Sequence, residues 1–179
     1  EYLANDKYGN KVLYLELLPT HSDQEINISY QVARQEKQAY RQSEDDTLKY
    51  IGAENFLPVG DRFETIAMQV IKDKQANSPL TKARALYDYL IDEMRYAKQG
   101  IYGTGDANYA CDSKSGNCTE FHSFFISLAR SAGIPARFAV GAAIPSERDE
   151  GGVDGYHCWA EFYAEGKWWP VDISEANKY

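Results

Sequence analysis

The pattern of apolar and polar side chains changes along this chain and divides it into two parts. Residues 12–18 form an apolar run broken by a single glutamate, and residues 26–33 alternate between apolar and polar side chains. Both patterns predict β-strands. Because two strands alone cannot bury an apolar face, we expect residues 1–45 to be a β-rich segment of a truncated or shared module. The polar, acidic stretch 34–48 is the expected linker, and residues 46–179 form the expected second domain.

Beyond the linker, the apolar period lengthens to that of a helix. Residues 61–77 and 80–94 each place their apolar side chains on one face, which predicts two amphipathic helices. The glycine-rich stretch 98–117 lacks the Gly-Lys-Ser/Thr ending of a phosphate loop, so it predicts the wall of an active site and not a nucleotide site. Residues 137–144 predict a strand, and the acidic segment 145–155 predicts a surface loop or lid.

A third helix is predicted to begin at a cysteine. Asn117 is a good N-cap, and Glu120 lies three residues later, where its carboxylate reaches back to the amide of the cap. The apolar residues that follow share one helical face, which we expect to be buried: Phe121, Phe124, Phe125, Leu128 and Ala129. Cys118 lies in the first turn, where unpaired amides and the helix dipole favour a thiolate over a thiol. We therefore expect Cys118 to be a nucleophile.

The last part of the chain predicts a β-hairpin, with strands at 157–163 and 168–173 and a loop at Glu165 and Gly166. In that register Phe162 lies opposite Trp169, and His157 and Asp172 are diagonal neighbours on one face, with Cα atoms about 7–8 Å apart. The other face is apolar enough to be core: Cys158, Ala160, Phe162, Trp169, Val171 and Ile173. The pattern thus supplies a nucleophile, a base and an orienting acid, the parts of a cysteine acyl-transfer site.

Charge and cysteine content narrow the classes of partner. The net charge is −8, and there is no basic stripe, so we expect neither nucleic acid nor an anionic membrane surface as a partner. No apolar run approaches the length that crosses a bilayer. Three cysteines cannot form a complete disulfide framework. Since the chain begins at Glu1 and not at a methionine, we expect a processed N-terminus and favour an extracytoplasmic location; the oligomeric state stays open.

Three segments resemble the core of the transglutaminase-like superfamily of thiol enzymes: GNCTEFHSFFISLARSAGIPARFAVG, HCWAEFY and WWPVDIS. The resemblance covers residues 50–175. It implies an α+β, papain-like fold in which the cysteine helix packs on an antiparallel sheet, preceded here by a small β-rich segment as in bacterial members. It also implies that Cys118, His157 and Asp172 are the catalytic residues. The chain ends seven residues after Asp172, where members usually continue, so we expect a fragment.

The resemblance also implies the chemistry. The Cys118 thiolate would attack a glutamine-type carboxamide or a peptide carbonyl of a peptide or protein substrate and form a thioester, and we favour hydrolysis over cross-linking. A second oxyanion donor is expected upstream of the cysteine; Tyr96 is our candidate, with Tyr102 and Tyr109 as rivals. Trp159 is expected to contact the substrate. No acidic cluster has calcium-ligand spacing, so no metal or other cofactor is expected.

Three alternatives stay open at this point. A catalytically silent module would use Trp159, Trp168 and the 14 tyrosines to line a peptide or glycan groove. A zinc site would draw on the following residues: Cys111, Cys118, His122, His157 and Cys158. Cys111 and Cys118 would pair reversibly in a redox lock, although an ordinary loop thiol is the simpler interpretation of Cys111.

Overall fold

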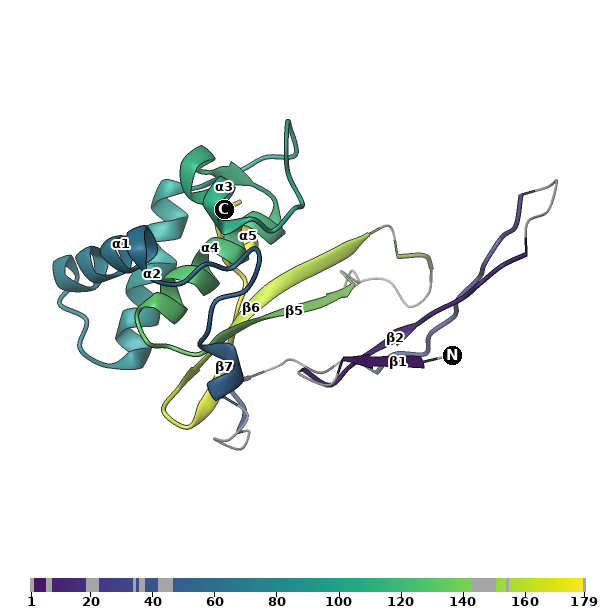
Figure 1. Cartoon of the computed structure of the whole chain (residues 1–179), viewed down its shortest axis with the longest axis horizontal. Helices are drawn as coiled ribbons and strands as arrows, with labels where there is room; N and C mark the ends of the chain where they lie inside the picture. The colour runs from purple at the N-terminus through teal and green to yellow at the C-terminus, as the bar shows by residue number, and fades with distance from the viewer. Residues whose placement is uncertain are drawn as a thin grey trace. The chain divides into compact units, whose positions relative to one another are not determined.

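The computed structural model describes residues 2–5, 8–18, 23–33, 35, 38–41, 47–142, 151–153 and 155–178. They belong to two compact units, Glu1–Glu36 and Lys37–Tyr179. The first unit contains an antiparallel pair of strands, β1 (Tyr2–Asn5) and β2 (Asn10–Leu13) (Figure 1). A turn at residues 8 and 9 joins the pair, and Gly9 adopts the positive φ of 71° that this turn requires. The assignment of residues 1–45 to a truncated module stays a prediction.

The prediction of strands at residues 12–18 and 26–33 is largely wrong. Residues 14–18 continue past β2 without regular structure, and residues 26–33 form no strand. Every residue from 23 to 33 is exposed, including the apolar side chains of the alternating pattern. Alternation predicts a strand only where a surface covers its apolar face, and within the described part of this unit nothing covers these residues.

The second unit is a mixed α+β structure, so the predicted fold class is confirmed. Its elements in chain order are a 3₁₀ turn (Leu48–Tyr50), α1 (Asp61–Asp73), α2 (Pro79–Glu93), β3 (Arg95–Tyr96), α3 (Ala107–Ser113), β4 (Ser115–Gly116), α4 (Cys118–Ser131), β5 (Ala136–Ala142), β6 (Tyr156–Ala164), β7 (Lys167–Val171) and α5 (Ile173–Ala176). The expected lid at 145–155 lies mostly outside the described residues. Within the described ranges, no helix has the length and apolar character needed to span a bilayer.

The main sheet has the strand order β5-β6-β7 and is antiparallel throughout. Phe162 lies opposite Trp169, which confirms the predicted register of the hairpin. Tyr40 continues the sheet beyond β7, because its backbone exchanges hydrogen bonds of 3.0 and 2.7 Å with Trp168. A separate short parallel pair, β3 with β4, places Tyr96 beside Gly116.

Helix α4 is the centre of this unit. It packs against α1, α2 and α3 on one side and against β5 and β6 on the other (Figure 1). The apolar stripe predicted from the sequence is fully buried, but the opposite face is buried as well, and it carries polar side chains: His122, Ser123, Ser127 and Arg130. A helix enclosed on both sides buries residues that an amphipathic pattern assigns to solvent.

The predicted loop at 98–117 contains a helix, α3, that the glycine content conceals. Asp106 caps it, since the carboxylate Oδ1 accepts a hydrogen bond of 2.8 Å from the Asn108 amide. Ala107, Ala110 and Cys111 then face the core at helical spacing. With only seven residues, α3 is too short for the apolar period to stand out from the flanking glycines.

The remaining loop is held to the start of α4 by one buried carboxylate. Glu120 is fully buried, and its oxygens accept hydrogen bonds of 2.9–3.2 Å from the amides of Gly103, Thr104 and Gly105. A fourth amide, that of Asn117, donates to Oε2 at 3.0 Å. At Gly116 an added Cβ would lie 2.4 Å from the Glu120 Cβ. The Glu120 side chain can therefore occupy this position only because residue 116 has no side chain.

We expect Glu120→Gln to lower the free energy of unfolding by about 2–4 kcal/mol, because one pair of buried amides then faces an NH₂ group instead of an acceptor. Urea titration followed by circular dichroism measures the change. The matched control is Glu64→Gln, the same substitution at an exposed position in the first turn of α1. A loss at residue 120 no larger than that of the control would contradict the anchoring role.

Candidate active site

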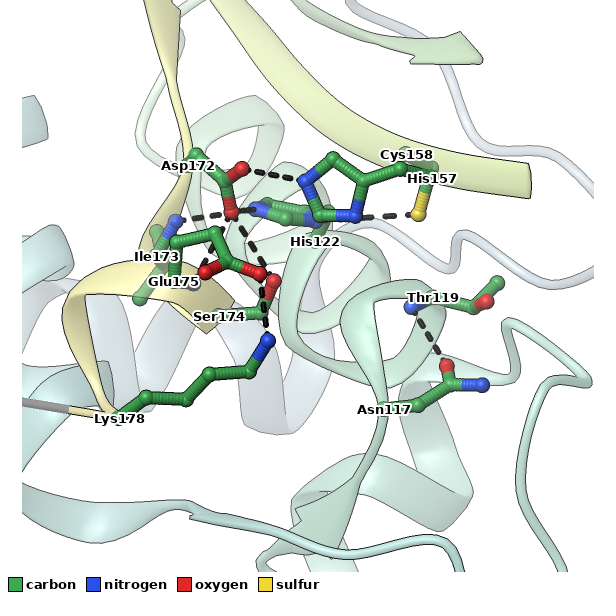
Figure 2. Close-up of polar contacts among 10 residues, drawn as sticks. All are labelled: Asn117, Thr119, His122, His157, Cys158, Asp172, Ile173, Ser174, Glu175 and Lys178. Atoms are coloured by element: carbon green, nitrogen blue, oxygen red, sulfur yellow. Dashed lines mark hydrogen bonds and ion pairs between the residues drawn. The ribbon is translucent and has the colours of Figure 1, made fainter. Parts of the chain in front are cut away.

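Cys118 is the first residue of α4, as the capping pattern predicts. The Asn117 side chain accepts a hydrogen bond of 2.8 Å from the Thr119 amide (Figure 2). The Glu120 carboxylate accepts one from the Asn117 amide, and both halves of the capping box are present. The Cys118 side chain is 5% exposed. Its sulfur therefore sits at the positive end of the central helix with little access to bulk water.

His157 and Asp172 are brought together from two strands. His157 lies on β6, and Asp172 follows the last residue of β7. The predicted register places the two side chains diagonally across the ladder, and His157 Nε2 lies 2.5 Å from Asp172 Oδ2 (Figure 2). The second ring nitrogen of His157 is then left for Cys118, whose hydrogen bonding and charge raise the pKa of the imidazole.

Asp172 has a structural task in addition to its contact with His157. Its second oxygen, Oδ1, accepts hydrogen bonds from the Ser174 hydroxyl at 2.9 Å and from the Glu175 amide at 3.1 Å, and it thereby caps α5 (Figure 2). One carboxylate oxygen thus fixes the local backbone while the other faces the imidazole, so capping and orienting the histidine do not compete.

The site stabilises a thiolate beside an imidazolium. A hydrogen bond from the Cys158 thiol and another from His157 lower the pKa of Cys118 to about 5, against the effect of burial. Burial also lowers the pKa of His157, but the hydrogen bonds and charges of Asp172 and Cys118 outweigh it, and the net shift is upward. Burial raises the pKa of Asp172, yet the bonds from His157 and Glu175 bring it below the ordinary value. All three shifts favour the charged forms.

The thiol beside Cys118 is Cys158 and not Cys111. Cys158 is buried on β6, and its hydrogen bond to Cys118 raises its own pKa far above the ordinary value, so it stays a neutral donor. Cys111 lies on α3 in the core, and all three cysteines are free. Among the described residues, no group of three histidine, cysteine or acidic side chains is placed to hold a metal ion, and the zinc alternative therefore has no support here.

Two further predicted residues flank the site. Tyr96 lies on β3, its ring packs against Phe121 with centroids 6.3 Å apart, and the Lys178 ammonium lies 4.6 Å from its centroid. The Trp159 ring is 6.4 Å from that of His157, and it crosses the neighbouring strand over Gly141, where a Cβ would come within 3.1 Å of the indole. Their contact with a substrate stays a prediction.

The rivals of Tyr96 lie elsewhere along the chain before α4. Tyr102 is exposed in the loop held by Glu120, and Tyr109 is half-buried on α3. Trp168, proposed as the wall of a groove, is instead fully buried against Tyr50, Tyr163 and Arg137. It is therefore part of the core.

His122, which the sequence suggested only as a ligand in the zinc alternative, is a further neighbour of the site. His122 lies one turn beyond Cys118, is fully buried, and contacts both Cys158 and the backbone after Asp172. The i, i+4 spacing from Cys118 is the signal in the sequence that could have placed His122 beside the site.

Known proteins resemble this chain in sequence. The sequence profile of the transglutaminase-like superfamily matches residues 65–173. An uncharacterized protein of Haemophilus influenzae is 32% identical over 130 residues, which are 60% of this chain and 35% of that protein. The protein YebA of Bacillus subtilis is 27% identical over 136 residues, which are 68% of this chain and 18% of YebA. The chain thus spans about a third or less of the length of these relatives.

Solved structures share the fold. A candidate cysteine protease of Cytophaga hutchinsonii aligns with a TM-score of 0.57 and 19% identity over 74% of this chain and 43% of that one. The periplasmic domain of TgpA from Pseudomonas aeruginosa, solved with ethylmercury bound, aligns with a TM-score of 0.51 and 23% identity over 71% of this chain and 48% of that one. The papain-like, transglutaminase-like core expected from the sequence is thereby confirmed.

We expect iodoacetamide to alkylate Cys118 at a rate that rises with pH around a midpoint near 5, because only the thiolate reacts; an ordinary cysteine has its midpoint at about 8.5. His157→Ala removes an imidazolium that favours the thiolate, so the midpoint moves upward. Peptide mapping assigns the label to Cys118 and separates it from Cys111 and Cys158. A midpoint near that of free cysteine in the folded protein would contradict the predicted ion pair.

Proposed function

We propose that this chain, which belongs to the transglutaminase-like superfamily, is a cysteine-dependent enzyme that transfers acyl groups from amide substrates through a thioester on Cys118. The observation that carries the proposal is the position of His157, which is bonded to Asp172 and whose pKa is raised by that bond and by the nearby Cys118. A thiolate with a pKa of about 5 at a helix N-terminus is what an attack on a carbonyl needs, and packing alone does not call for it.

The proposed reaction uses each group in turn. The Cys118 thiolate attacks the carbonyl carbon of a peptide or glutamine-type amide, and the resulting oxyanion accepts hydrogen bonds from the Cys118 amide and from the Tyr96 hydroxyl. The His157 imidazolium then protonates the departing amine, which leaves an S-acyl thioester. Water attacks the thioester while His157 accepts its proton, so the products are a carboxylic acid and the regenerated thiolate. Asp172 holds the imidazole in one orientation throughout.

Exposure of the site supports water as the acceptor. The side chains of His157 and Asp172 are 21% and 30% exposed, so water reaches the imidazole that would activate it. Transfer to an amine requires a site that excludes water. We therefore propose hydrolysis of peptide or protein amides over cross-linking, with Trp159 as an apolar contact for the substrate.

The burial of Trp168 disfavours a catalytically silent binding module. The groove of such a module would be lined by Trp159 and Trp168, but Trp168 lies in the core. Trp159 remains available under either hypothesis, because it is half-buried next to His157.

We also propose that the enzyme acts outside the cytoplasm. The similarity of fold to the periplasmic domain of TgpA supports this location. Fractionation of cells that express the full-length protein, with immunodetection of each fraction, tests it.

The central test measures amide hydrolysis with glutamine-amide, peptide and glycosyl-asparagine substrates, scoring ammonia or peptide release against incorporation of a labelled amine. We expect release without incorporation, and we expect Cys118→Ala to abolish it. Asp172→Asn should lower kcat by roughly 10²–10⁴-fold, because the imidazole loses its fixed tautomer. Cys111→Ala, a change at a buried cysteine outside the site, is the matched control and should keep activity. Turnover that survives in Cys118→Ala would refute the mechanism.

We expect Tyr96→Phe to lower kcat about 10²-fold with little change in KM, because an oxyanion donor acts mainly in the transition state. The substitution keeps the ring that packs on Phe121, so the unfolding midpoint should not move. Tyr109→Phe on α3 removes the hydroxyl of a rival and serves as the comparison. If instead Tyr109→Phe lowers kcat and Tyr96→Phe does not, the donor has been assigned to the wrong tyrosine.

A further inference from the structure

His122 joins the cysteine helix to the segment that carries Asp172. Its Nε2 accepts a hydrogen bond of 3.0 Å from the backbone amide of Ile173, the residue directly after Asp172 (Figure 2). The same nitrogen lies 3.7 Å from Asp172 Oδ1, which is too long for a hydrogen bond. On the other side of the ring, Nδ1 lies 3.9 Å from Cys158 Sγ.

These contacts determine the tautomer of the ring. Because Nε2 accepts a hydrogen bond from a backbone amide, the ring proton of the neutral imidazole must sit on Nδ1. That proton lies on the side of the ring that faces Cys158 Sγ. Burial lowers the pKa of His122 to about 4, despite the opposing charge of Asp172, so the ring is neutral near pH 7.

The backbone at Asp172 lies beyond the last pair of the sheet, where the cap of α5 and the burial of Ile173 in the core also hold it. The ladder between β6 and β7 ends at the pair Ala160 and Val171, one residue before Asp172. The helix that follows, α5, is four residues long. The bond from the Ile173 amide to His122 is thus a direct polar link between this segment and the helix that carries Cys118.

We propose that His122 is a positioning residue: its neutral ring clamps the backbone after Asp172 to the first turn of α4 and so sets the place of the Asp172 carboxylate relative to His157 and Cys118. In the opposite tautomer an Nε2–H would face the Ile173 amide, which would then lose its acceptor. The clamp itself is independent of catalysis, but its effect on turnover rests on the function proposed above.

Two substitutions separate the clamp from the volume of the ring. His122→Gln places an amide oxygen near the position of Nε2 and keeps an acceptor for Ile173, whereas His122→Asn is too short to reach it. We expect the His157 imidazole to keep its raised pKa in the Gln variant and to fall towards the ordinary value of about 6.5 in the Asn variant, as NMR titration measures. The midpoint of Cys118 alkylation should rise in the Asn variant alone, with kcat at least 10-fold lower and KM little changed.

The same experiments contain the outcomes that overturn the proposal. A folded Asn variant with the wild-type His157 titration and alkylation profile would remove the need for a clamp, and so would a Gln variant as impaired as the Asn variant. If neither variant folds, ¹⁵N-histidine spectra of the wild-type protein decide, because a proton on Nε2 of His122 is incompatible with the clamp. If the wild type hydrolyses no amide but its spectra and titrations behave as expected, the proposed function fails while the clamp stands.

Discussion

The carboxylate of Glu120 is buried in the second unit, and four backbone amides donate to it from two segments of the chain. A buried carboxylate is tolerated only when such bonds replace its hydration. The consequence is geometric, because the same side chain that caps α4 also pulls the loop at Gly103 to Gly105 against the helix start. The first turn of α4 is therefore held from the loop side as well as by its packing, and the position of Cys118 depends on both.

The parts of the fold that the sequence predicts are those set by local rules. The capping box at Asn117 and the register of the hairpin each depend on a few neighbouring residues, and the structure contains both. The strand expected at 26–33 needed a covering surface, which no local pattern encodes. Helix α3 was concealed by its glycine-rich flanks. Trp168 was assigned to a groove because the residues that contact it, Tyr40 and Tyr50, are remote in sequence and no local pattern reveals them. The predictions that failed concern features that depend on residues distant in the sequence.

Two histidines lie near the Asp172 carboxylate, and their surroundings shift their pKa values in opposite directions. His157 is partly exposed and faces both Asp172 and Cys118, so its pKa is raised; His122 is fully buried, so its pKa is lowered to about 4. Groups with separated pKa values in one site take different tasks. The surroundings of His157 favour its protonated form, whereas those of His122 confine it to neutral hydrogen bonds. This division follows from burial and does not require different residue types.

The low pKa of Cys118 gives less advantage by itself than its size suggests. A thiol of ordinary pKa near 8.5 is ionised to roughly 3% at pH 7, so a shift to about 5 raises the thiolate fraction about 30-fold. The intrinsic reactivity of a thiolate falls as its pKa falls, with a Brønsted slope of about 0.4–0.5, so a shift of this size lowers the rate constant of attack by about 25- to 60-fold. The two effects nearly cancel. In the proposed reaction the benefit of the ion pair must then come from His157, whose proton is already in place for the leaving amine when the thiolate attacks, and this is why the geometry around Asp172 matters more than the acidity of the sulfur.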